Sequence, residues 1–152
     1  MTIKIVGVKQ RHLDALYEAK CKDLQIRPTK DQERRFFEFC QKTIFDRKIL
    51  MREQGLGPAS AAVLGKIVAG NDLFSYLDVG RNNLGNLGLQ ALMHRGIRQN
   101  CSLIHLDIGS NDVTCDGAIM LFKSIESHPT LTSLVLANHD RLHRNRLGDK
   151  AC

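Results

Sequence analysis

Apolar and polar positions recur along residues 49–152 with a spacing of 28 or 29 residues. Each unit opens with an apolar pair that flanks one residue of any type, and this alternation predicts a short β-strand with one buried face. The four triplets are Ile49-Leu50-Met51, Leu77-Asp78-Val79, Leu106-Asp107-Ile108 and Leu134-Val135-Leu136. A fixed spacing of this kind is typical of a tandem-repeat protein.

A helix is predicted after each of the first three triplets. Every such stretch has a small residue, a leucine four positions later and an apolar residue nine positions before the next triplet: Ser60, Leu64 and Val68; Gly88, Leu92 and Ile97; Gly117, Leu121 and Ile125. The helices are expected to end near Asn71, Asn100 and His128, where Pro129 stops the last one. One strand and one helix cannot bury both apolar faces alone, so the units are expected to stack.

An amide side chain follows the first three triplets at one shared position, as Gln54, Asn82 and Asn111. In a stack of units these side chains would form a structural amide column. The column is expected to hydrogen-bond backbone groups that the turn leaves unpaired. Gly85 and Gly88 follow Asn82 and allow a sharp turn and close packing of the next helix.

The segments LDVGRNNLGNLGLQAL (77–92) and LDIGSNDVTCDGAIMLF (106–122) resemble the long repeat of ribonuclease-inhibitor-like leucine-rich-repeat proteins. The resemblance extends over residues 49–152. It implies an α/β solenoid with parallel strands on its concave side and helices on its convex side. It implies no single function, because this repeat serves many binding tasks. The expected repeats are 49–76, 77–105, 106–133 and an incomplete 134–152.

The fourth repeat departs from the pattern. Asn138 follows its triplet, but a turn motif returns later as Asn145-Arg146-Leu147-Gly148, so that 13 residues separate Leu134 from Leu147, against 7 between Leu77 and Leu84. No helix follows before Cys152. Solenoids ordinarily end in a polar cap. We therefore expect that the natural chain continues past Cys152, or that a second copy or another molecule covers the open repeat.

Residues 1–48 are expected to form a basic helical segment. They hold 12 Lys/Arg and 7 Asp/Glu, a net charge of +5 within a total of +6. Residues 3–8 indicate a short strand or an extended arm. A helix is predicted over 10–25 and is broken at Pro28. Thr29 and Gln32 have the spacing of a capping box for a second helix, which places Phe36, Phe37, Cys40 and Ile44 on one face.

These two helices are predicted to cap the first repeat by covering the edge of its strand. The alternative is a separate basic docking element for an acidic filament or for nucleic acid. No recognised nucleic-acid motif accompanies the basic residues, so a nucleic-acid partner is disfavoured.

The five cysteines are odd in number and match no disulfide framework or CxxC metal motif. Lys4 and Lys9 interrupt the opening apolar run, so no signal peptide is predicted, and no stretch reaches the length of a membrane span. Reduced thiols in a cytoplasmic or cytoskeletal protein are the expectation. Cys101 and Cys115 are expected to be buried within the repeats.

The sequence predicts no enzyme and no cofactor, because it has no phosphate-binding glycine loop or nucleophile motif. Asp78 and Asp107 share one strand position, and neighbouring strands lie about 4.8 Å apart, so their carboxylates should lie close together. Paired acids suit acid–base chemistry, but an acidic spot on an open binding face is favoured. His139 and His143 could form one edge of a zinc site, although the sequence offers no third ligand.

The leading hypothesis is a non-catalytic protein–protein interaction module or scaffold that binds through the concave strand face and the 138–146 loop. The alternatives are a structural subunit of a cytoskeletal or ciliary assembly, a GTPase-regulating protein and a nucleic-acid-binding protein. A GTPase-activating family shares this repeat type but needs a positioned arginine and a longer arc of repeats. The candidate partner-binding residues are Arg52, Tyr76, Asp78, Arg81, His105 and Asp107 on the strands and turns, and Arg141, His143, Arg144 and Arg146 in the loop.

Overall fold

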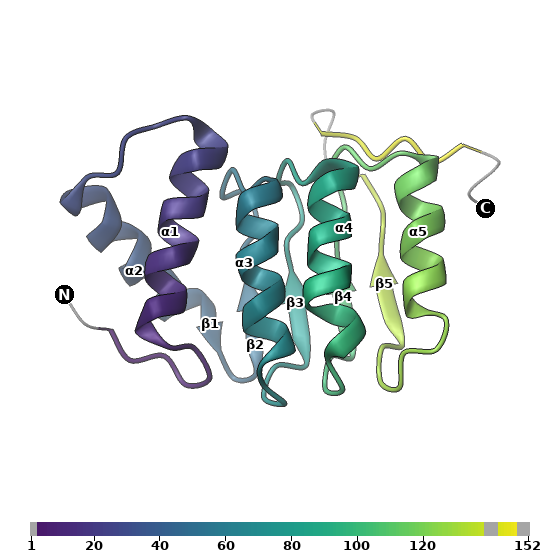
Figure 1. The fold of residues 1–152 in the computed structure, drawn as a ribbon, viewed down its shortest axis with the longest axis horizontal. Coiled ribbons are helices and arrows are strands. Elements are labelled where there is room, and N and C mark those ends of the chain that lie inside the picture. The colour runs from purple at the N-terminus through teal and green to yellow at the C-terminus, as the bar shows by residue number, and fades with distance from the viewer. Residues whose placement is uncertain (1–2, 139–142, 149–152) are drawn as a thin grey trace.

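A computed structural model describes residues 3–138 and 143–148 of the chain. The helices α1, α3, α4 and α5 form one layer and the strands a second layer behind it (Figure 1). In chain order the elements are α1 (Gln10–Leu24), α2 (Lys30–Thr43), β1 (Ile44–Phe45), β2 (Lys48–Leu50), α3 (Pro58–Ala69), β3 (Tyr76–Asp78), α4 (Gly85–Arg95), the 3-10 helix η1 (Ile97–Gln99), β4 (His105–Asp107), α5 (Cys115–Ile125) and β5 (Ser133–Val135).

The strands form one sheet in the order β1-β2-β3-β4-β5. The four strands from β2 to β5 are parallel, and each begins one residue before its predicted apolar triplet. Ile49, Leu77 and Leu106 occupy one register position and are fully buried. The predicted alternation therefore places one strand face in the core, against the helices.

β1 was not predicted, because the helical spacing of the apolar residues continues as far as Ile44. The helix ends at Thr43, and β1 pairs antiparallel with β2 across the two residues Asp46 and Arg47. Both have positive φ values, 47° and 65°, as a tight hairpin turn requires. Ile44 is still buried, but in the sheet rather than on the helix.

The small residue predicted at the start of each helix is buried in all three units, at Ser60, Gly88 and Gly117. A Cβ atom on Gly117 would overlap the side-chain oxygen of Asn86. That oxygen accepts the N–H of Thr114 at 3.0 Å, and the Asn86 amide donates to the Thr114 hydroxyl at 2.7 Å. The glycine thus leaves room for a polar link between the starts of α4 and α5.

In each turn between helix and strand, one side chain accepts backbone N–H groups of the turn. This side chain is Asn71 in the first unit, Asn100 in the second and His128 in the third. Asn100 accepts the N–H groups of Ser102 and Leu103 and donates to a carbonyl of the preceding unit. His128 repeats this arrangement, since its Nδ1 accepts two backbone N–H groups at 3.2 and 3.0 Å and its Nε2 lies 3.0 Å from the Ile97 carbonyl oxygen. These bonds place the His128 proton on Nε2.

The amide column runs along the opposite turns. Asn82 and Asn111 are buried, accept backbone N–H groups of the preceding unit and donate to the carbonyl that directly follows its strand. Gln54 begins the column, but it is half-exposed, and among the described residues its amide donates to two carbonyls of its own turn. In the fourth unit Asn145 makes the corresponding bonds, at 2.9 and 3.0 Å to N–H groups and 3.1 Å to a carbonyl. Asn138 instead binds the backbone of Asn145.

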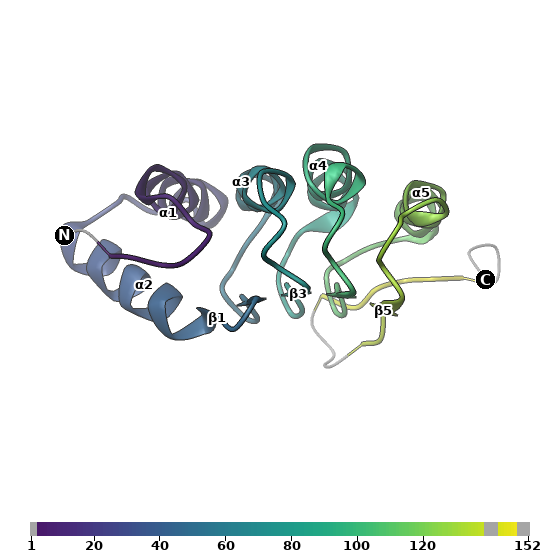
Figure 2. The same cartoon turned by 90° about the horizontal axis from the view of Figure 1, so that it is seen from below.

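α1 lies beside α3 in the helix layer, and α2 lies beside the β1 and β2 end of the sheet (Figure 2). The carboxylate of Asp23, near the end of α1, accepts the N–H groups of Gly57, Ala59 and Ser60 at 2.8, 3.0 and 2.9 Å. Since Pro58 has no N–H, one carboxylate serves every backbone donor of residues 57–60. The N-terminal segment is thereby tied to the first strand–helix unit.

The structure corrects two expectations for the N-terminal segment. Residues 5–8 form a tight turn rather than a strand, with Gly7 at a φ of 86° and the Val8 N–H donating to Ile5. The Thr29 hydroxyl caps α2 by accepting the Gln32 N–H at 3.2 Å. However, the Thr29 N–H is taken by the Tyr17 hydroxyl at 3.1 Å, so the reciprocal half of the predicted capping box is replaced by a contact to α1.

Candidate interaction surface

The sheet has one face toward the helix layer and one face away from it (Figure 2), and the outer face carries two adjacent rows of side chains. We call it the strand face. The sheet register aligns Lys48, Tyr76, His105 and Ser133 in the first row and Leu50, Asp78, Asp107 and Val135 in the second. Among the described residues, no helix lies over β3, β4 or β5 on this side.

The first row forms a continuous chain of contacts. The rings of Tyr76 and His105 are stacked, with centroids 4.3 Å apart and planes inclined by 14°. The Lys48 ammonium lies 5.6 Å from the Tyr76 ring centroid, and His105 Nδ1 lies 2.7 Å from the Ser133 hydroxyl. All four side chains are exposed or half-exposed. The row therefore presents an amphipathic, conformationally restricted strip to the outside.

In the second row Arg52 joins the two carboxylates. Its Nε lies 3.1 Å from Asp78 Oδ2 and its Nη2 lies 2.8 Å from Asp107 Oδ2. The other oxygens accept the N–H groups of Gly80 and Gly109 at 2.9 and 2.8 Å. A Cβ atom on Gly80 would lie between 3.1 and 3.4 Å from both carboxylates and the guanidinium. The absence of a side chain at Gly80 therefore leaves room for the Arg52 side chain to reach both aspartates.

This geometry changes the interpretation of the two aspartates. They do lie close together, but Asp78 is only 8% exposed and Asp107 only 4%, so they are not the open acidic spot that the sequence predicted. Burial opposes the charge on Arg52, but hydrogen bonding and attraction to Asp78, together with attraction to Asp107, outweigh it and raise the pKa of Arg52. The two carboxylates share one guanidinium, and these ion pairs and backbone hydrogen bonds restrain all three side chains.

The remaining candidate residues lie near the turns. Arg81 is half-exposed and forms an ion pair with Glu53 of the preceding unit. His143 is exposed, with its Nδ1 2.7 Å from Asp112 Oδ2. Arg144 and Arg146 are exposed on either side of buried Asn145. Arg141 and His139 lie outside the described residues.

Lys48 and Ser133 were not among the predicted binding residues, although each occupies the strand position of Tyr76 and His105 in its own unit. The spacing of 28 and 29 residues could have found both. It did not mark them because neither residue type stands out as a binding group. Only the register shows that they extend the Tyr76–His105 stack at both ends.

No group of His, Cys, Asp and Glu within the described residues has the arrangement of a metal site. Cys21 and Cys40 are buried free thiols, and burial raises the pKa of Cys40 to about 12. Cys101 was expected to be buried, but it is exposed in the turn that follows Asn100, and Cys115 is half-exposed. Within the described residues no helix is both long enough and apolar enough to cross a membrane.

Comparison with known proteins agrees with the repeat geometry. Residues 70–93 and 99–122 each match the family model described as Leucine Rich repeat. Each match ends within a helix of this structure, α4 or α5, and contains the strand before it. A search of curated proteins found no match to this sequence. Residues 70–93 and 99–122 are therefore leucine-rich repeats, within an α/β fold in which the strands β2 to β5 are parallel.

Proposed function

We propose that this protein is a non-catalytic interaction module that binds another protein through the strand face. In this proposal the units form a solenoid of the ribonuclease-inhibitor-like type, the strand face is its concave side, and α1, α2 and β1 cap its first repeat. The 28- and 29-residue repeat length supports the subtype. The bonds from Asp23 to the start of α3 support the cap.

The observation that carries the proposal is the Lys48–Tyr76–His105–Ser133 row. Tyrosine and other amphipathic rings are enriched at protein interfaces, because they contribute large contact areas at a small entropic cost. Here the stacked pair is held between a lysine and a hydroxyl, so little side-chain freedom is left to lose on binding. The Arg52 cluster beside the row links a side chain of β3 to a side chain of β4.

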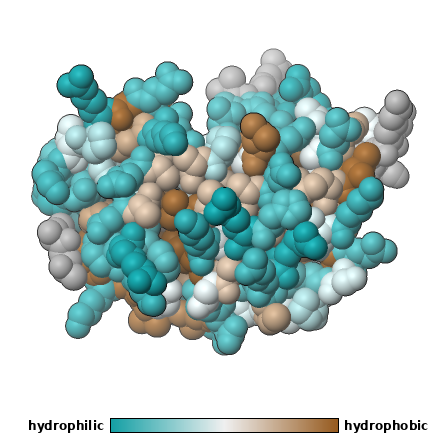
Figure 3. All heavy atoms as spheres, viewed as in Figure 1, coloured by the Kyte–Doolittle hydropathy of each residue, from teal (hydrophilic) through white to brown (hydrophobic). Residues whose placement is uncertain are grey.

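The helix side differs in character. Figure 3, which views that side, shows a mostly hydrophilic surface with small, separated apolar patches. Its exposed apolar side chains include Leu87 and Phe122 on α4 and α5. Scattered apolar residues of this kind are normal for a protein surface and do not mark a binding site.

The experiment is affinity capture with the tagged full chain and two variants. One variant carries Tyr76→Ala and His105→Ala, and the matched control carries Arg98→Ala and Lys123→Ala on the helix side, where both residues are exposed. Circular dichroism verifies that all three chains fold. Proteins captured by the unmodified chain and by the control should be recovered at least about tenfold less with the strand-face variant. Equal recovery with all three chains would contradict the proposal.

A further inference from the structure

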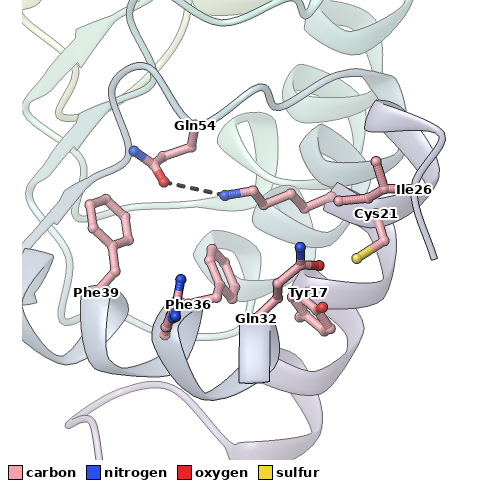
Figure 4. A pocket seen from close by; sticks show the side chains of 9 residues that line it. Tyr17, Cys21, Ile26, Gln32, Phe36, Phe39 and Gln54 are labelled. Atoms are coloured by element: carbon pink, nitrogen blue, oxygen red, sulfur yellow. Dashed lines mark hydrogen bonds between the residues drawn. The ribbon is translucent and has the colours of Figure 1, made fainter. Parts of the chain in front are cut away.

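A cavity of about 340 Å³ lies between α1, α2 and the turn that follows β2 (Figure 4). Phe36 and Phe39 of α2 and Ile26 after α1 supply its apolar walls, while Lys20, Arg35 and Gln54 supply polar groups. The volume is at the lower end of the range for small-molecule pockets, and apolar walls with a few convergent polar groups are their usual composition.

Lys20 is the central polar group. Its ammonium lies 4.9 Å from the centroid of the Phe36 ring and 3.3 Å from the Gln54 side-chain oxygen, the contact drawn as a dashed line in Figure 4. An ammonium has three donors, and Gln54 is the one acceptor bonded to it within the described residues. It forms no ion pair with any described residue, and burial lowers the pKa of Lys20.

Among the described residues that line the cavity, the two charged ones, Lys20 and Arg35, are both cationic. Arg35 binds Asp31 at 3.1 Å, but its side chain is 72% exposed and can turn toward the cavity mouth. Ile26, at 44% exposure, and half-exposed Phe39 leave apolar surface in contact with solvent beside these cations. A ligand complementary to both features has an apolar body and one anionic end.

We propose that this cavity binds small carboxylates with an aromatic or aliphatic body, in which the carboxylate pairs with the Lys20 ammonium and the body contacts Phe36 and Phe39. The charge-assisted hydrogen bond supplies a partner for the half-buried ammonium. The ring contacts remove apolar surface from water. The inference is independent of the strand face, because none of the residues that line this cavity belongs to its two rows.

The test is an NMR titration of the ¹⁵N-labelled full chain with 3-phenylpropanoate and with its neutral analogue, 3-phenylpropanamide. We expect a saturable response of backbone amides near the cavity, with a dissociation constant on the order of 1 mM for a ligand of this size. The amide should bind at least about tenfold more weakly, because it lacks the charge that Lys20 recognises.

The variant Lys20→Met keeps most of the side-chain stem and removes the ammonium. It should bind the carboxylate at least about tenfold more weakly, whereas Lys22→Met, which changes an exposed lysine on the same helix, should bind as the unmodified chain does. The same spectra report whether each variant is folded. The proposal is overturned if the carboxylate does not saturate, if the amide or the Lys20→Met chain binds equally well, or if the responding amides lie elsewhere.

Discussion

Replacing Asp23 should loosen the connection between the N-terminal segment and the first repeat. The carboxylate receives the N–H groups of residues 57, 59 and 60 at 2.8–3.0 Å, across 34 to 37 residues of sequence. Gly57 permits this approach, since a Cβ there would lie 2.9 Å from the carboxylate carbon. In Asp23→Ala the three donors at the start of α3 lose their acceptor, and the helix loses a negative charge at its positive end.

The magnitude can be estimated from the structure. Loss of a helix cap costs about 0.5–2 kcal/mol, and loss of a favourable charge at the N-terminus adds about 0.3–1 kcal/mol. Asp23 is half-exposed, so water can replace part of the lost bonding. We expect Asp23→Ala to lower the free energy of unfolding by about 2 kcal/mol and Asp23→Asn, which keeps one acceptor oxygen, by about 1 kcal/mol.

The assay is urea unfolding at 25 °C followed by circular dichroism. With a denaturant slope of about 2 kcal/mol per molar, a loss of 2 kcal/mol lowers the midpoint by about 1 M. Asp14→Ala is the matched control, because Asp14 lies on the same helix, is exposed and, among the described residues, accepts a hydrogen bond from the Gln10 side chain alone. If Asp23→Ala and Asp14→Ala differ by less than about 0.5 kcal/mol, the anchoring role of Asp23 is refuted.

Three further predictions concern other parts of the chain. His128→Asn should change stability by less than about 1 kcal/mol, because an asparagine can reproduce the bonds of the ring, whereas His128→Ala should cost about 1–3 kcal/mol in the same unfolding assay. Gly117→Ala should cost about 1–2 kcal/mol by displacing the Asn86 side chain. In a double-mutant cycle its cost should fall when Asn86→Ala is already present, and strict additivity would argue against that contact. Replacing Arg144 and Arg146 by glutamate should reduce partner capture if the loop contributes to binding, and unchanged capture would exclude these two residues.

The periodic features of the fold could be predicted because repetition averages out local ambiguity. The apolar triplets located four parallel strands to within one residue, and the shared amide position located Asn82 and Asn111. The irregular fourth unit was predicted less well. Asn138 follows its triplet more closely, yet Asn145 makes the backbone bonds, because the inserted residues separate the turn motif from the strand.

Contacts between distant segments could not be predicted in this way. Nothing in the sequence around Asp23 indicates that it binds the start of α3. In the sequence, Lys20 is not distinguished from the other basic residues of its amphipathic helix. The strand face was found only in part. The outward positions of Tyr76 and His105 were predicted, but their stacking and the burial of Asp107 under Arg52 depend on side-chain geometry that spacing does not encode.

The most direct test of the strand-face proposal uses lysines already present in the chain. The complex of the full chain with the captured protein is treated with an amine-reactive cross-linker and analysed by mass spectrometry. Lys48 lies in the first row of the strand face, whereas Lys66 and Lys123 are exposed on the helices α3 and α5. We expect cross-links to the partner from Lys48 and few from Lys66 or Lys123. Cross-links to the partner from Lys66 and Lys123, with none from Lys48, would contradict it.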